Sequence, residues 1–275
     1  MKHENAWVTW LILVATLSPQ ILRANDSSNV ERQVRAALKG NLVTLRTPTA
    51  STRLELNSNA QSLGTLSPAP WTTGGLSRVR EVRLKQDLLN IDCERVLVAL
   101  RAGKAPGTPS LVPLPTGKQM SIILHLAAVP SEAAQITALL SQVFEPIDLE
   151  QRIANYWQPA QGTTPEPGTI VGTLEGGRPV YKSNRGVVEP PKPEYAPDPE
   201  YTQSARQRRV QGTAVLMVIV NEKGFPEILE VTRDLGAGLD LRALAAVAEW
   251  RFKPATYNNE PVAVMINVEV SFRMY

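Results

Sequence analysis

The stretch QGTAVLMVIVNEKGFPEILEVTR, residues 211–233, decides the fold of the C-terminal part of the chain. Residues 213–220 carry apolar side chains on both faces if extended, which is typical of a central strand covered on both sides. The turn NEKG follows, with Gly224 at the position that favours a positive φ, and a second strand is predicted over residues 227–233. The sequence therefore predicts a hairpin.

A helix is predicted on each side of this hairpin. Asp198, Pro199 and Glu200 form a helix start, because they supply a capping oxygen, a fixed φ and an acid at the positive end of the dipole. Three arginines would fall in the last turn of that helix, where cations favour the negative end of the dipole; they are Arg206, Arg208 and Arg209. After the turn LGAGLD, apolar residues recur at helical spacing: Leu239, Ala243, Ala246, Val247 and Trp250.

The last fifteen residues alternate between apolar and polar side chains, which predicts a strand with one buried face and one wet face. The apolar set is Val264, Ile266, Val268, Val270, Phe272 and Met274. The polar set is Asn267, Glu269, Ser271 and Arg273. The order helix, strand, strand, helix, strand with an antiparallel sheet defines an α+β module over residues 195–275.

The same residues resemble the C-terminal domain of the TonB energy-transducer family. The resemblance rests on Pro199, Tyr201 and Ala205, on QGTAVLMVIV followed by EKG, and on LGAGLD, EWRFKPAT, EPV and the alternating last strand. Thr202 stands where many family members carry a second proline. The resemblance covers residues 195–275, and residues 25–157 resemble no family that we recognise.

The resemblance implies a periplasmic protein of Gram-negative bacteria that binds or couples to other proteins. Domains of this family contact outer-membrane receptors in transport, commonly by accepting a receptor peptide as an added strand. The partner would be such a receptor or a second copy of the chain. An envelope scaffold or dimerisation module without energy transduction is the alternative, and an enzyme in the N-terminal domain is a third reading.

The first 24 residues have the layout of a secretory signal peptide. Lys2 and His3 precede the apolar run AWVTWLILVATL, residues 6–17, and a polar segment follows Ala24. A core of this length falls short of the 17 to 25 residues or so that span a bilayer. We therefore expect a cleaved signal and a periplasmic protein. The alternative is an uncleaved inner-membrane anchor with the rest of the chain facing the periplasm, as force-transmitting members of the family have.

Residues 25–157 predict a mainly antiparallel β domain with flanking helices. Residues 29–39 carry apolar side chains at helical spacing, and short apolar alternations with polar breaks follow between residues 42 and 125. The Pro/Gly-rich residues 102–117 are expected to form an exposed loop. A helix is predicted over residues 136–144 and ended by Pro146, and Asp148 would cap a second one bearing Leu149, Ile153, Tyr156 and Trp157. Residues 158–194 are rich in Pro and Gly and predict a semi-rigid linker with short extended pieces at TIVGTL and RPVYKS.

Composition and candidate reactive residues favour binding over chemistry. The formal net charge of the 275 residues is +3, with bases and acids interspersed, so nucleic acid is not an expected partner. The single cysteine, Cys93, is expected to be a packing residue, and His125 a strand residue. Asp92 and Glu94 share a face in an extended chain and predict a solvent-facing pair. The sequence predicts no catalytic, cofactor-binding or metal-binding residues and no cofactor.

Overall fold

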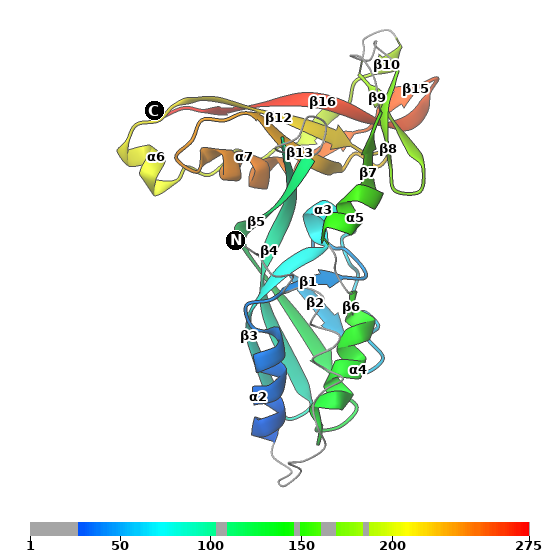
Figure 1. The fold of residues 1–275 in the computed structure, drawn as a ribbon, viewed down its shortest axis with the longest axis vertical. Helices are drawn as coiled ribbons and strands as arrows, with labels where there is room; N and C mark the ends of the chain where they lie inside the picture. The colour runs from blue at the N-terminus through cyan, green and yellow to red at the C-terminus, as the bar shows by residue number, and fades with distance from the viewer. Residues whose placement is uncertain (1–26, 103–108, 146–148, 161–168, 184–186, 275) are drawn as a thin grey trace, which may run out of the picture. The chain divides into compact units, whose positions relative to one another are not determined.

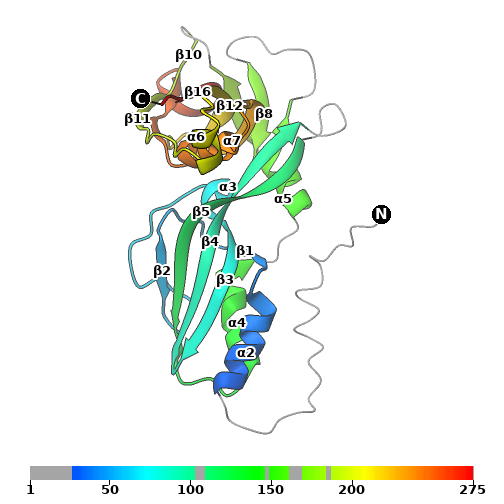
Figure 2. The same ribbon diagram turned by 90° about the vertical axis from the view of Figure 1, so that its left-hand side faces the viewer.

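The computed structural model describes residues 27–102, 109–145, 149–160, 169–183 and 187–274. The predicted signal peptide at residues 1–24 lies outside them. The chain is an α+β protein that divides into two compact units. The first unit holds Met1–Ala69, Gly74–Val96 and Gly117–Asp148, and the second holds Pro70–Thr73, Leu97–Thr116 and Leu149–Tyr275. Figures 1 and 2 show the elements of each.

The first unit is a sheet covered on one face by two helices. The helices are α2 (Ser27–Leu38) and α4 (Ala133–Val143). The sheet order is β6, β1, β3, β4, β5, β2, built from β6 (Phe144–Glu145), β1 (Leu42–Leu45), β3 (Leu76–Lys85), β4 (Leu88–Ala102), β5 (Pro109–His125) and β2 (Arg53–Leu56). Of β4 and β5, the parts up to Val96 and from Gly117 on belong to this unit. Its β1/β3, β1/β6 and β3/β4 pairs are antiparallel, whereas β2 and β5 are parallel. The unit is therefore mainly antiparallel, with one parallel pair at an edge.

The periodicity of α2 and α4 explains where the core of the first unit lies. The buried residues of α2 are Val30, Val34 and Leu38, one helical turn apart. Those of α4 are Ile136, Leu139, Leu140 and Val143, as the apolar stripe predicts. Both sets pack in one cluster with strand residues such as Val79 and Ile91. Helix α4 ends at Val143, so Phe144 is already extended; Pro146 and Asp148 lie outside the described residues.

Much of the Pro/Gly-rich stretch 102–117 is strand rather than loop, so this expectation is corrected. Strand β4 runs to Ala102 and β5 begins at Pro109. Successive N–H groups in a strand point to opposite edges, and Pro109, Pro113 and Pro115 are spaced by even numbers. Their missing donors therefore fall on one edge and leave the other edge intact for pairing.

The second unit contains the module predicted from residues 211–233. Its elements in chain order are α6 (Gln203–Gln207), β12 (Gly212–Val220), β13 (Pro226–Arg233), α7 (Leu239–Val247), β14 (Arg251–Lys253), β15 (Ala255–Tyr257) and β16 (Glu260–Phe272). Strand β12 lies between β13 and β16 and is antiparallel to both. Helix α7 packs on the face that holds Leu216, Val218 and Val268, and its Val247 lies in the same cluster. The opposite face is less covered, since Val215 and Met217 are half-buried.

The segment expected to be a linker, residues 158–194, belongs to the second unit and carries strands that join its main sheet, except for the last one, which pairs with β14 in a separate two-stranded sheet. These are β7 (Trp157–Pro159), which follows α5 (Leu149–Tyr156), then β8 (Ile170–Leu174), β9 (Arg178–Lys182), β10 (Val188–Glu189) and β11 (Lys192–Tyr195). The extended pieces TIVGTL and RPVYKS are β8 and β9. Strand β9 pairs in parallel with Ala263–Met265 of β16, and its Val180 is fully buried. Local composition does not reveal such a pairing because the partners are about 80 residues apart.

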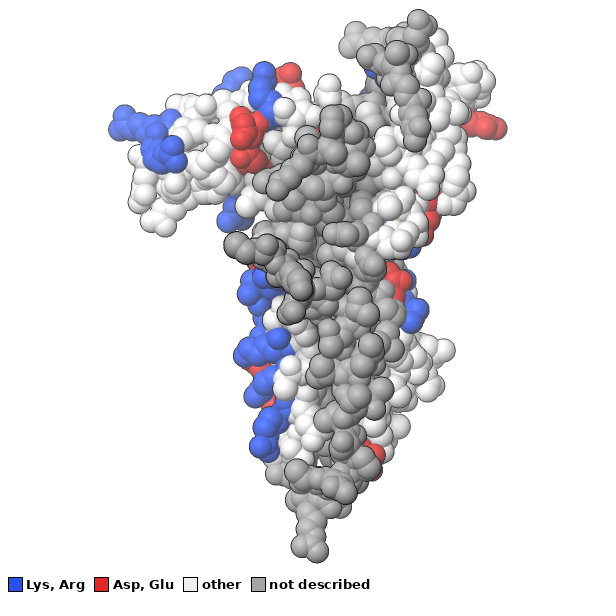
Figure 3. All heavy atoms as spheres, in the orientation of Figure 1, with Lys and Arg blue, Asp and Glu red and all other residues white. Residues whose placement is uncertain are grey.

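Helix α6 begins later than predicted, because Thr202 and not Asp198 caps it. The Thr202 hydroxyl accepts a hydrogen bond from the Ala205 N–H at 3.0 Å and donates one to the Ala237 carbonyl at 2.7 Å. The helix ends at Gln207, so only Arg206 lies in its last turn. Lys and Arg atoms gather at the end of the second unit where α6 lies (Figure 3).

Gly224 has the positive φ that the turn predicts, at +78°. A Cβ at this position would lie 1.8 Å from the Phe252 carbonyl oxygen, and the Phe252 N–H donates to the Gly224 carbonyl at 2.9 Å. The turn between β12 and β13 is therefore held against β14 by a contact that only glycine permits.

We expect Gly224→Ala to lower the free energy of unfolding by at least about 2 kcal/mol, since both the positive φ and the overlap with backbone must be relieved. The matched control is Gly236→Ala, where φ is +70° and nothing lies within 4 Å of the added Cβ. That change should cost about 1 kcal/mol. Urea denaturation measures both, and equal losses would contradict the importance of the Phe252 contact.

Candidate partner-binding surface

The last strand of the second unit, β16, has an open edge over its C-terminal half. Its partner β12 pairs with Val264–Phe272 along one edge. On residues 260–265 the remaining pairings are those with β15 and β9. For residues 266–272, no second strand is found among the described residues. The seven residues after Met265 thus present main-chain donors and acceptors to whatever lies beside them.

Side chains along this open segment alternate as the sequence predicts. Val268, Val270 and Phe272 are buried, and Asn267, Glu269 and Ser271 are exposed. The Ser271 hydroxyl lies 3.3 Å from that of Thr213 on β12. The segment is anchored by its buried face while its backbone edge stays accessible, which suits a binding surface better than a reacting site.

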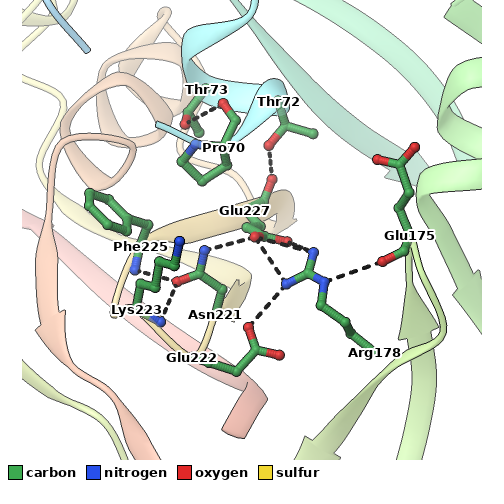
Figure 4. A network of polar contacts seen from close by, with 10 residues as sticks. All are labelled: Pro70, Thr72, Thr73, Glu175, Arg178, Asn221, Glu222, Lys223, Phe225 and Glu227. Atoms are coloured by element: carbon green, nitrogen blue, oxygen red, sulfur yellow. Dashed lines mark hydrogen bonds and ion pairs between the residues drawn. The ribbon is translucent and has the colours of Figure 1, made fainter. Parts of the chain in front are cut away.

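An ion pair with a buried carboxylate holds the start of β9 beside the β12–β13 turn (Figure 4). The Arg178 guanidinium on β9 lies 3.1 Å from Glu227 Oε2 and 3.0 Å from Glu222 Oε2. The Glu227 side chain is only 5% exposed, whereas that of Glu222 is 30% exposed. Burial disfavours the arginine cation, but the hydrogen bond and charge of Glu227 outweigh it, so the pKa of Arg178 lies above its ordinary value.

Asn221 completes this network and shapes the β12–β13 turn. Its side-chain N–H donates to Glu227 Oε1 at 2.7 Å, and its Oδ1 accepts from the Lys223 and Phe225 N–H groups at 2.9 Å each. The Thr72 hydroxyl donates to the Glu227 carbonyl. Burial, followed by the nearby Glu227 carboxylate, raises the pKa of Tyr156. Because these polar groups are paired with one another, we assign the network a structural role.

Arg178 and Glu227 were missed by the sequence reasoning. They are 49 residues apart, and Arg178 lies in the segment expected to be a linker. The one available signal was an acid directly after Pro226 in a strand that is otherwise apolar at its start. A buried acid in such a place needs a cation.

Cys93 occupies the packing position expected of it. It is fully buried, its Sγ lies 3.9 Å from the Ile91 carbonyl oxygen, and burial raises the pKa of the thiol to about 12. A thiol in this state is a poor nucleophile at neutral pH.

The structure does not bring the other candidate residues together into a reacting group. His125 Nε2 lies 2.8 Å from Glu55 Oε1, and that hydrogen bond, with one from Arg53, lowers the pKa of Glu55. Asp92 accepts from the Ser121 hydroxyl at 2.9 Å and pairs with Arg83.

Glu94 differs from the expectation of a solvent-facing carboxylate. Its side chain is 8% exposed, because it pairs with Arg80 and accepts from the Gly117 N–H at 3.1 Å. Asp92 and Glu94 thus lie in separate ion pairs.

Within the described ranges, no three His, Cys, Asp or Glu residues are grouped so that they could hold a metal ion. Likewise, none of the described helices has the length and apolar character needed to span a membrane.

The geometry defines residues 195–274 as part of a small α+β domain whose sheet ends in an open edge. Residues 197–274 match the family described as Gram-negative bacterial TonB protein C-terminal, and they form a TonB C-terminal domain.

Two curated proteins are similar to this region. Protein tonB2 of Pseudomonas aeruginosa is 33% identical over 79 residues, which is 28% of this chain and 29% of that protein. Protein TonB of Vibrio cholerae is 29% identical over 77 residues, which is 28% of this chain and 32% of that protein. The chain therefore spans about a third or less of the length of the curated relatives it matches.

A solution NMR structure of the Pseudomonas aeruginosa TonB C-terminal domain is also similar. It shares 22% sequence identity and covers 33% of this chain and 90% of its own, with a TM-score of 0.27. A likeness at that level carries no conclusion about the arrangement of the strands.

We expect Glu227→Gln to lower the free energy of unfolding by about 2 kcal/mol, because it leaves the partly buried Arg178 cation without its buried counter-charge. Glu222→Gln removes a more exposed partner of the same guanidinium and should cost less than about 1 kcal/mol. Denaturant midpoints compare the two. Hydrogen exchange at Val180 reports whether β9 has come loose; unchanged protection in Glu227→Gln would show that the pair does not hold β9.

Proposed function

We propose that this chain is a periplasmic protein-binding or coupling protein of the TonB C-terminal type, associated with transport across the outer membrane. The match of residues 197–274 to that family carries the proposal. The partner is an outer-membrane receptor, and contact is made by adding a receptor strand to the open edge of β16. We assign no cofactor and no enzymatic role.

The open edge supports this mode of contact quantitatively. Seven residues, from Ile266 to Phe272, offer roughly seven main-chain hydrogen bonds to an added strand. At about 1 kcal/mol net each, they exceed an association cost of at least about 4 kcal/mol by a small margin. The resulting complex is weak unless side-chain contacts or tethering to the same membrane add to it.

Energy coupling requires more than binding. A transducer must be held in the inner membrane while it pulls on its receptor, so coupling depends on whether residues 1–24 remain attached. If they are cleaved, the domain is an envelope scaffold that docks on a neighbour or on a second copy through the same edge. Both readings use β16, and they differ in the partner and the anchor.

A photo-crosslinking amino acid in place of Glu269, an exposed β16 residue, is expected to give an adduct with an outer-membrane protein in intact cells. The control position is Lys223, which is exposed in the β12–β13 turn and away from the open edge. An adduct of twice the chain mass at Glu269 favours the dimerisation alternative. Equal adducts at both positions, or none at Glu269, would contradict the proposal that a partner strand adds to this edge.

The N-terminus of the protein isolated from the cell envelope separates coupling from scaffolding. We expect a mature chain that begins near Asn25 and is found in the soluble periplasm, because the apolar run of residues 6–17 is short for a bilayer span. Edman sequencing of the membrane and soluble fractions measures it. An intact N-terminus in the membrane fraction would reverse the assignment and support a transducer.

A further inference from the structure

Strand β3 of the first unit carries four cations on one face of the sheet. Its Val79, Val82 and Leu84 are buried in the cluster that α2 and α4 cover. The residues between them point to the opposite face, which no described helix covers. We call four of them the β3 cation row: Arg78, Arg80, Arg83 and Lys85. Figure 3 shows Lys and Arg atoms gathered along the side of the first unit where β3 and α2 lie.

A β-bulge places all four cations on the same face. Val79 and Glu81 are opposite consecutive residues of β4, so Arg80 between them has no partner of its own. In a regular strand Arg83 and Lys85 would share the buried face of Val79, because side chains alternate. The extra residue shifts this alternation by one and turns both side chains outward.

Two carboxylates of β4 lie beneath the row. Glu94 pairs with Arg80, and Asp92 pairs with Arg83. The two arginine side chains are 51% and 61% exposed, whereas those of Glu94 and Asp92 are 8% and 30% exposed. A guanidinium group has five N–H donors, and one carboxylate uses at most two of them in a bidentate pair. The acids therefore hold the guanidinium groups in place and leave them as the outer layer of this face.

The other two cations of the row have no such counter-charge. Over the residues that the structure describes, neither Arg78 nor Lys85 forms an ion pair, and the buried Nε of Arg78 has no hydrogen-bond partner. Asp87, in the turn after β3, also forms no ion pair there. Elsewhere on this face, Arg53 of β2 is balanced by Glu55 at 3.0 Å. The positive charge of the face is therefore concentrated on β3.

We propose that the β3 cation row is an interaction surface of the first unit that binds the Asp or Glu carboxylates of an extended acidic polypeptide. Arg78 and Arg80, like Arg83 and Lys85, are two residues apart, which is about 6.6 Å in a strand. An extended partner with a carboxylate at every second residue has the same repeat. Arginine suits this role because its planar guanidinium binds carboxylates in bidentate fashion. The proposal gives the first unit a role of its own, independent of strand addition to β16.

A polypeptide fits the row better than a lipid surface or a nucleic acid. Stable attachment to a membrane combines basic residues with apolar side chains that enter the bilayer. The exposed large hydrophobic residues of the described chain are Leu63, Val129, Ile170, Val187 and Tyr195, and none of them lies on β2, β3, β4 or β5. Single-stranded nucleic acids are bound by stacking on aromatic rings, and these four strands contain no Phe, Tyr or Trp. Arginine without such residues is typical of protein interfaces.

The test uses the ¹⁵N-labelled full chain and two ten-residue peptides, one of alternating Glu and Ser and one of alternating Gln and Ser. We expect the acidic peptide to bind about tenfold more tightly at low salt, the combined effect of four weak surface ion pairs. The difference should shrink as salt rises, because exposed charges are screened. The resonance shifts that the acidic peptide causes should centre on residues 78–85.

Charge variants assign the binding to the row. Arg78→Gln with Lys85→Gln removes the two cations that form no ion pair and should lower the tenfold preference to about threefold, since half of the row remains. If this double variant unfolds, Lys85→Glu changes the charge by the same amount at one exposed residue and should also leave about threefold. The control, Lys223→Gln with Lys253→Gln, removes two charges from exposed positions of the second unit and should keep the full preference. Thermal unfolding shows which variants fold.

Three results would overturn the inference. The first is equal binding of the two peptides, or an equal loss of preference in the control. The second is an acidic peptide that shifts β16 and leaves residues 78–85 unchanged. The third is binding of phosphatidylglycerol vesicles that depends on Arg78 and Lys85 while the acidic peptide does not bind, since the partner would then be a lipid surface. Strand addition to β16 is measured at other resonances, so its success or failure is distinguished from that of the row.

Discussion

The ion pair between Arg178 and Glu227 is the constraint on which the second unit depends. A buried carboxylate is tolerated only if it is paired and hydrogen-bonded, and Glu227 meets that condition through Arg178 and Asn221. Such a pair adds little net stability compared with apolar packing, but losing one partner is costly. The ion pair therefore determines where β9 lies. Strand β9 packs beside the β12–β13 turn because Arg178 can reach Glu227 there.

Local patterns predicted the elements whose signals are local. Alternation identified β16, apolar residues on both faces identified β12, and Gly224 identified a turn that needs a positive φ. The pairing of β9 with β16 could not be predicted, because it joins residues about 80 positions apart and β9 itself contains Pro179. Proline-rich composition indicated a linker, yet proline is compatible with a strand when its missing donor falls where no ladder bond is needed.

The sequence predicted a protein-binding domain, but it predicted only some of the local structure around the candidate site. The resemblance to TonB C-terminal domains implied contact at a sheet edge, and the alternation of β16 predicted one buried and one wet face, but neither indicated which edge is open. The start of α6 was wrong by several residues, because Asp198 satisfies the local rule for a cap while the Thr202 hydroxyl satisfies two backbone groups at once. One of these, the Ala237 carbonyl, is distant in sequence. That shift matters, since it removes Arg208 and Arg209 from the helix and from the explanation that the dipole provided.

The strand edge is bounded at both ends, and one of the two bounds is set by β9, which lies outside the family match. At one end β9 occupies the edge as far as Met265, and Arg178 holds it there. At the other end the ladder with β12 stops at Phe272, against which Tyr201 packs. The open edge between these limits has room for a strand of about seven residues. The ion pair therefore contributes to the length of the open edge, because it holds the strand β9 that closes the edge up to Met265.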